Sequence, residues 1–299
     1  MRRRRYPGLV KKKIFISGIL LFLAGVCGLE AEDFFFDSAG VRIHYTVEGK
    51  GEPVVLIHGF AVDIAWNWGD PGIIKGLEDH YHVIAIDNRG HGRSDRPHDP
   101  KKYGVNMVSD VTRLLDHLNI KKAHIVGYSM GGRIASVFLT SHPDRVRTAI
   151  LGATPWVNAD SLPARVVWAN QLAESLEQGK GIAPLIIRLT PRGEQPPNAE
   201  QMEAINKTFM ERNDVLALAA ATRGTAGLQP SEAKLRANKL PVLAVVGERD
   251  PIKAEVDSLV GVLGNVKLVV IPGANHMNAP GRPEFLDALK TFLGAHGDK

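Results

Sequence analysis

The stretch Ile125-Val126-Gly127-Tyr128-Ser129-Met130-Gly131-Gly132 decides the fold of this chain. A short apolar run passes directly into a helical pattern, with one glycine two residues before a serine and another two residues after it. A serine on so sharp a turn adopts strained backbone angles, and the residues two positions before and after it come so close to other groups that they must lack a Cβ atom. The turn would expose the Ser129 hydroxyl at the carboxyl end of a sheet. The Met130 amide would open the next helix, where a developing negative charge is favoured.

Short apolar runs on both sides of this turn predict the other strands. The run at residues 41–48 alternates apolar and polar residues like an exposed strand, whereas the rest suit burial on both faces. These buried runs lie at residues 54–57, 83–86, 123–126, 146–151, 242–246 and 266–271. Helical spacing appears between them, for example over residues 105–118. The alternation predicts an α/β fold, a mostly parallel sheet with helices on both faces.

The alternation of strands and helices breaks between residues 156 and 238. Amphipathic segments replace the strands there, at residues 162–178, 182–189 and 198–212. Asn198 and Gln201 have the spacing of a capping box at the start of the last one. We therefore expect a core formed by residues 32–155 and 239–299, with residues 156–238 inserted as a helical cap.

Composition and charge exclude several classes of protein. With 299 residues, 44% of them hydrophobic and 23% charged, the chain is a globular protein and not a disordered or multi-pass membrane protein. The net charge of +5 comes from seven basic residues among the first thirteen. From residue 32 onward, 30 basic residues face 31 acidic ones. Such a nearly neutral body gives no reason to expect a nucleic-acid partner.

The N-terminus is typical of an export signal. Basic residues precede an uncharged run at residues 14–29, and acidic residues follow it. A helix of 16 residues reaches about 24 Å, short of the roughly 30 Å hydrocarbon core, so we expect residues 1–31 to be a signal peptide, with a membrane anchor as the alternative. Cys27, the only cysteine, follows a segment that resembles a lipobox shifted by one residue. Contact with a membrane would come only through an uncleaved or lipidated N-terminus, and we expect a periplasmic or secreted protein.

The chain resembles the α/β-hydrolase fold family over residues 34–296, and the turn at Ser129 is the strongest motif of the likeness. His58-Gly59-Phe60 resembles the family's oxyanion-loop segment, which implies the amides of Phe60 and Met130 as oxyanion donors. The stretch from Asp87 to Asp95, DNRGHGRSD, resembles a family loop whose role there is structural.

Two later segments match the family's positions for the acid and the base. Gly247-Glu248-Arg249-Asp250-Pro251 follows one predicted strand, and Gly273-Ala274-Asn275-His276 follows the next. The resemblance thus implies a triad of Ser129, Asp250 and His276, in the family's chain order. His276 would accept the serine proton and return it to the leaving group, while Asp250 would fix the imidazole tautomer.

Several residues keep alternative interpretations. Asp250 could instead cap the following helix, with Glu248 beside it and Asp160 as a more distant carboxylate. His58 is interpreted as a structural residue that hydrogen-bonds the loop. His80 and His82 lie close together in the sequence, but no further candidate metal ligands accompany them, so we predict no metal site. No dinucleotide-binding or phosphate-binding motif is complete, so we also predict no cofactor.

The sequence does not decide which aromatic and methionine side chains line the substrate pocket. Trp66, Trp68 and Trp156 fit either an apolar pocket or ordinary core packing. Substrate choice should depend on the cap, whose candidate pocket residues are Trp156, Trp168, Met202, Phe209 and Met210.

The resemblance implies an exported serine hydrolase that cleaves a small carboxylic ester through an acyl-enzyme. Serine at the turn argues against dehalogenase and epoxide hydrolase chemistry, because those relatives need a carboxylate nucleophile. Carbon–carbon bond hydrolase, lactonase and cofactor-free perhydrolase activities remain open on the same triad. A ligand-binding protein with a silent triad is the alternative from another class.

Overall fold

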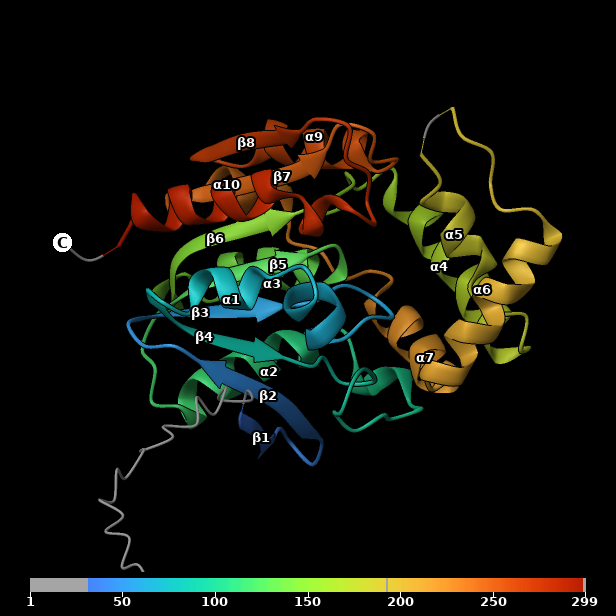
Figure 1. Ribbon diagram of the computed structural model, residues 1–299, viewed down its shortest axis with the longest axis horizontal. Helices are drawn as coiled ribbons and strands as arrows, with labels where there is room; N and C mark the ends of the chain where they lie inside the picture. Colours follow the sequence, from blue (N-terminus) through green and yellow to red (C-terminus); the bar gives the residue numbers. More distant parts are fainter. Residues whose placement is uncertain (1–31, 192, 298–299) are drawn as a thin grey trace, which may run out of the picture. The chain divides into compact units, whose positions relative to one another are not determined.

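One eight-stranded sheet runs through the computed structural model, which describes residues 32–191 and 193–297 (Figure 1). The strand order is β1-β2-β4-β3-β5-β6-β7-β8. The pairs β1–β2 and β2–β4 are antiparallel, and every later pair is parallel. The strands span β1 Glu32–Asp37, β2 Arg42–Glu48, β3 Glu52–Ile57, β4 Tyr81–Ile86, β5 Ala123–Tyr128, β6 Val146–Gly152, β7 Val242–Gly247 and β8 Val266–Ile271.

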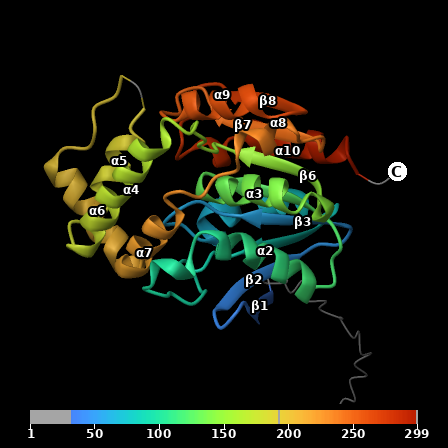
Figure 2. The ribbon, with the colours of Figure 1, turned by 180° about the vertical axis from the view of Figure 1, so that it is seen from behind.

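Helices cover both faces of this sheet because its central strands are apolar on both sides. In β3, Val55 and Ile57 belong to one core cluster, and Val54 and Leu56 belong to the other. The first cluster packs against α2 (Val105–His117) and α3 (Met130–Ser141). The second packs against α1 (Ile73–Leu77) and α10 (Pro283–Gly294). Figures 1 and 2 show these two pairs of helices on opposite faces of the sheet.

The structure confirms the predicted strands and helices, with ends that shift by at most two residues. The predicted burial of residues 266–271 on both faces is wrong, because β8 is an edge strand with Lys267 and Val270 exposed. The structure also contains a strand that the sequence analysis did not predict, β1, whose partner among the described strands is β2. The run Phe34-Phe35-Phe36 has no alternation to mark it as an edge strand. The pairing with β2 decides which side of β1 each phenylalanine faces. Phe36 is buried in the core, whereas the guanidinium of Arg42 lies 4.3 Å from the centre of the Phe35 ring.

The described residues between β6 and β7, in the segment predicted as an insert, form five helices. They are α4 Leu162–Glu177, α5 Ala183–Arg188, α6 Ala199–Arg212, α7 Val215–Thr225 and α8 Glu232–Arg236. The predicted capping box of Asn198 and Gln201 is present at the start of α6. No helix in the described part of the chain combines the length and the hydropathy that a membrane span needs.

Two ends of this segment pack differently from the expectation. Buried residues of α4, together with Leu218 and Ala219 of α7, form a cluster with Ala61 from the loop after β3, whereas Ala220 and Ala221 of α7 belong to the core cluster on the sheet. Trp156 and Leu235 of α8 also belong to the core cluster on the sheet. Their large apolar side chains fill space beside the sheet. The separate apolar cluster of the cap therefore includes residues from only part of the predicted insert, residues 156–238.

A buried histidine links β1, β2 and the loop after β4. His44 on β2 places its Nδ1 2.7 Å from Asp87 Oδ2 and its Nε2 2.9 Å from Asp33 Oδ1. Burial lowers the pKa of His44, but the hydrogen bonds to the two carboxylates outweigh burial and raise the net pKa above its ordinary value of 6.5. Both ring nitrogens therefore act as donors in the protonated form, which the fold stabilises.

We expect this link to make stability depend on pH. Because the pKa of His44 is higher in the folded than in the unfolded protein, protonated His44 stabilises the folded state. This stabilisation is complete below about pH 6.5 and is lost as pH rises through the folded-state pKa. The difference in free energy of unfolding between wild type and His44→Gln should therefore be largest near pH 5 and shrink toward pH 9 in urea titrations. Exposed His80, changed to Gln, is the matched control. A difference for His44→Gln that does not vary with pH would contradict the assignment.

Candidate active site

The turn at Ser129 joins β5 to α3 and holds its serine in a conformation that few residues adopt. Ser129 has φ +53°, and its N–H donates to the Gly152 carbonyl on β6 at 2.8 Å. A Cβ atom at Gly127 would lie 2.3 Å from the Gly131 oxygen, and one at Gly131 would lie 2.0 Å from the Ile57 oxygen. Both glycines are therefore required by contact with neighbouring backbone, as the sequence predicted.

The structure brings Ser129, His276 and Asp250 into one hydrogen-bonded chain. His276 Nε2 lies 3.0 Å from Ser129 Oγ, and His276 Nδ1 lies 2.9 Å from Asp250 Oδ2. Asp250 follows β7 and His276 follows β8, so the carboxyl ends of neighbouring strands deliver them to the same edge of the sheet. Asp250 also accepts a hydrogen bond from the Ile252 N–H at 3.0 Å, which fixes the orientation of its carboxylate.

The two alternative carboxylates do not meet His276 in this arrangement. Glu248 is exposed and accepts a hydrogen bond from the Gly273 N–H at 2.8 Å. Asp160 is exposed in the turn before α4. Asp250 is 3% exposed and is the carboxylate that contacts the imidazole.

The two predicted oxyanion donors lie at the ends of adjacent strands. Phe60 follows β3, and Met130 is the first residue of α3. Neither backbone N–H donates a hydrogen bond to any residue that the structure describes. The loop of Phe60 lies against the turn, because a Cβ atom at Gly59 would come within 3.5 Å of Ser129 Cβ. Two unpaired amides thus lie beside the serine, as an oxyanion site requires.

His58 is a structural residue, which confirms its interpretation from the sequence. Its Nε2 accepts a hydrogen bond from the Asn88 N–H at 3.0 Å, and its Nδ1 donates to the Gly59 carbonyl at 2.7 Å. One donor and one acceptor define the neutral imidazole. Burial lowers the pKa of His58, although Asp87 acts in the opposite direction, so the neutral form is favoured.

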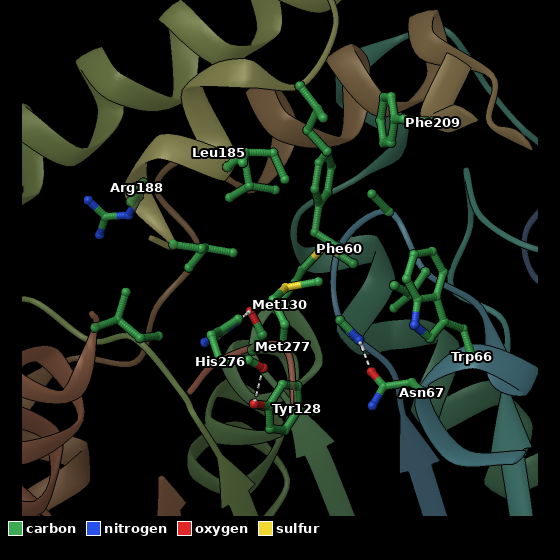
Figure 3. Close-up of a pocket in the computed structure, with 18 of the residues that line it drawn as sticks. Phe60, Trp66, Asn67, Tyr128, Met130, Leu185, Arg188, Phe209, His276 and Met277 are labelled. Atoms are coloured by element: carbon green, nitrogen blue, oxygen red, sulfur yellow. Dashed lines mark hydrogen bonds between the residues drawn. The ribbon is translucent and has the colours of Figure 1, made fainter. Parts of the chain in front are cut away.

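Two supporting residues were missed by the sequence analysis. Buried Asn67 accepts a hydrogen bond from the Gly59 N–H at 2.8 Å and so holds the loop that carries Phe60. Buried Tyr128 donates from its hydroxyl to the His276 carbonyl at 2.6 Å, and burial raises its pKa, which keeps the hydroxyl a donor. Figure 3 shows Asn67 and Tyr128 on separate sides of the cavity floor. Neither residue has a sequence signal, because both act through backbone groups that only folding brings near.

A cavity of about 930 Å³ lies above Ser129 and His276, between the sheet edge and the cap. Figure 3 shows Leu185 and Phe209 of the cap facing Met130 and His276 across it. Of the predicted pocket residues, Trp66, Trp168 and Phe209 line the cavity. Four others do not: Trp68 and Trp156 are buried in the core clusters, and Met202 and Met210 lie outside the lining.

Among the described residues, no group of three or more His, Cys, Asp or Glu side chains is placed to hold a metal ion. The polar groups around the serine hydroxyl include His276, with Asp250 on the far side of its ring, and the two free amides described above. This arrangement can activate a hydroxyl nucleophile and stabilise a negative charge on an oxygen beside it.

Comparison with known proteins supports the family that the motifs suggested. A family model described as alpha/beta hydrolase fold matches residues 52–179. A protein of Bacillus subtilis (strain 168), provisionally named 2-succinyl-6-hydroxy-2,4-cyclohexadiene-1-carboxylate synthase, is 30% identical over 254 residues, which cover 80% of this chain and 89% of that protein.

Solved structures extend the likeness. A thermophilic esterase from Thermogutta terrifontis, with malate bound, has a TM-score of 0.68 at 25% identity and covers 90% of this chain and 100% of its own. A structure from work on carboxylesterases of the thaumarchaeon Nitrososphaera gargenis has a TM-score of 0.68 at 26% identity and covers 87% and 98%. Because the motifs, the strand order and a relative matched over most of both chains agree, this chain belongs to the alpha/beta hydrolase fold family.

Proposed function

We propose that the protein is a serine hydrolase that cleaves a small carboxylic ester through an acyl-enzyme. The observation that carries this proposal is the chain of hydrogen bonds from Ser129 Oγ through His276 to Asp250, with the free amide of Met130 beside it. A serine hydroxyl is a weak nucleophile alone, and a neighbouring imidazole with a carboxylate behind it is the arrangement that activates one.

The geometry supports the following reaction. His276 Nε2 takes the proton of Ser129 as Oγ attacks the ester carbonyl, and the Phe60 and Met130 amides donate to the oxygen that becomes negative. Collapse of this intermediate breaks the bond to the alcohol oxygen, which leaves with the proton from His276. Water, deprotonated by the same nitrogen, then attacks the acyl-enzyme and releases the acid. Asp250 holds Nδ1 and stabilises the imidazolium at each stage.

The nucleophile and the cavity favour an ester over other substrates of related proteins. Attack by a hydroxyl on a carbonyl carbon gives an acyl ester that water can hydrolyse, whereas displacement of a halide or opening of an epoxide requires a carboxylate nucleophile. The two solved relatives described as an esterase and as part of work on carboxylesterases support the same choice. Phe60, Trp66 and Phe209 give the cavity an apolar wall that suits an acyl or alkoxy group.

Ester hydrolysis can be tested with p-nitrophenyl esters from acetate to palmitate. We expect turnover of the shorter members, and Ser129→Ala should reduce kcat on the order of 10⁶-fold. Ser258→Ala, on the exposed side of α9 (Lys253–Val262), is the matched control and should retain wild-type kcat. Folded protein with no turnover and no fluorophosphonate label on Ser129 would instead identify a binding protein with a silent triad. Label without turnover would favour a carbon–carbon, lactone or perhydrolase reaction.

Asn67 should act as a positioning residue for the oxyanion site. Asn67→Leu keeps the size of the side chain but removes the acceptor for the Gly59 N–H, so the Phe60 amide loses its support. Since small misplacement of a catalytic group lowers rate strongly, we expect kcat to fall by up to about 100-fold with little change in KM. Asn158→Leu, which changes an exposed turn, is the control. Wild-type kcat in a folded Asn67→Leu variant would refute this role.

We also propose that the protein acts outside the cytoplasm. This proposal is supported by the order of basic, apolar and acidic residues in the first 33 positions. The support comes from the sequence alone, since residues 1–31 lie outside the described structure. Mass spectrometry of exported protein should find a new N-terminus between about residues 27 and 33. An intact Met1 on the exported protein would indicate an uncleaved anchor instead.

A further inference from the structure

The cavity wall carries an excess of positive charge where it is shielded from solvent. Among its charged lining residues, the half-buried ones are Arg133, Arg165, Arg188 and Glu255. Arg188 and Glu255 form an ion pair between the cap and α9, and the Arg188 guanidinium lies 4.7 Å from the centre of the Trp168 ring. One carboxylate cannot neutralise three guanidinium groups, so the wall retains positive charge.

Arg165, on α4, is a guanidinium that has only neutral acceptors among the described residues. Its Nη1 donates to Gln229 Oε1 at 3.2 Å, and its Nη2 donates to the Leu228 carbonyl at 3.4 Å. Burial lowers the pKa of Arg165 to about 10, although Glu255 acts in the opposite direction. A half-buried cation without a carboxylate partner is stabilised when an anion reaches it.

The neighbours of Arg165 define the charge that this anion should have. Glu255 gives one carboxylate oxygen to Arg188, and its other oxygen, Oε2, is buried without a hydrogen-bond partner among the described residues. The pair is formally neutral, so Arg165, Arg188 and Glu255 together carry one positive charge. Arg133 on α3, a donor to the Thr225 carbonyl at 3.1 Å, adds a second elsewhere in the wall. A single carboxylate matches the charge of the first three side chains, whereas a dianionic phosphate would be repelled more strongly by Glu255.

The cavity offers different surroundings to the two ends of a substrate. Arg188 marks one side of the cavity and Trp66 the opposite side, with Phe60 and His276 between them (Figure 3). Trp66, Phe60 and Phe209 supply apolar surface, while Arg165, Arg188 and Glu255 supply half-buried charged groups. The exposed lining residues Asp70, Arg212 and Arg282 add charge where the cavity meets solvent. An ester with an apolar group at one end and a carboxylate at the other would satisfy both parts.

We propose that the cavity contains a carboxylate-binding site in which Arg165 donates the recognising hydrogen bonds, so that the substrate is an ester bearing a carboxylate. This inference rests on the proposed ester hydrolysis for the reaction, but the anion site can be measured by binding alone. Arg188 and Glu255 orient the site, and Arg165 supplies the charge that they leave uncompensated.

The test compares two ligands that differ in one charge, monobutyl glutarate and butyl methyl glutarate. Both are titrated by calorimetry into full-length Ser129→Ala protein, which cannot turn them over. We expect the monoanion to bind more tightly, and Arg165→Met in the same background to weaken its binding about 10- to 100-fold, as loss of hydrogen bonds to a charged group does. Arg165→Lys, which keeps the charge without the planar fork, should retain part of the preference.

Arg236→Met is the matched control, because Arg236 is an exposed arginine of α8 paired with Glu232. This variant should keep the full preference for the monoanion. Equal binding of the two ligands, no binding of either at millimolar concentration, or a preference that persists in folded Arg165→Met protein would overturn the proposal. A retained preference in a protein whose wild type hydrolyses no ester would overturn the proposed reaction and leave the anion site established.

Discussion

The contact between the turn at Ser129 and the backbone of β3 is the constraint on which the site depends. Ser129 has φ +53°, a conformation that costs about 1–3 kcal/mol and persists only when surrounding structure holds it. Here the Gly152 carbonyl accepts the Ser129 N–H, and Gly131 packs where a Cβ atom would lie 2.0 Å from the Ile57 oxygen. Strands β3 and β6 therefore fix the serine before any substrate arrives, and the same contact sets the Met130 amide beside the end of β3.

The molecule separates the groups that perform chemistry from the groups that select a substrate. Ser129, Asp250 and His276 follow the parallel strands β5, β7 and β8, whose backbone hydrogen bonds hold the strand ends in place. Strands β5 and β7 are also buried on both faces, whereas β8 is a partly exposed edge strand. The cap has its own apolar cluster, and it meets the core through the loop after β3, through the ion pair of Arg188 with Glu255, and through Ala220 and Ala221 of α7, which belong to the core cluster on the sheet. Changes in cap side chains can therefore alter the cavity without moving the triad.

Much of the fold and the site could be predicted because the relevant signals are local. Apolar runs and helical periodicity located the elements, and the glycines around Ser129 follow from the geometry of one turn. Strand β1 was missed because three consecutive phenylalanines have no alternation, and its position depends on pairing with β2. Trp156 was assigned as a cap pocket candidate, yet it lies in the sheet core and donates to the Pro230 carbonyl, a partner 74 residues away.

The sequence by itself determined the α/β architecture and the nucleophile turn at Ser129, since each follows from short patterns and their order along the chain. The resemblance to the α/β-hydrolase family added His276 as the expected base and Asp250 as one of the candidate acids. Only the tertiary structure decided which carboxylate meets His276, because Glu248 and Asp250 are two residues apart and differ in direction and burial. It also decided that Asn67 and Tyr128 support the site, and that Arg165 faces the cavity without a carboxylate partner among the described residues. Those assignments depend on contacts between segments that lie far apart in the chain, and no local pattern encodes them.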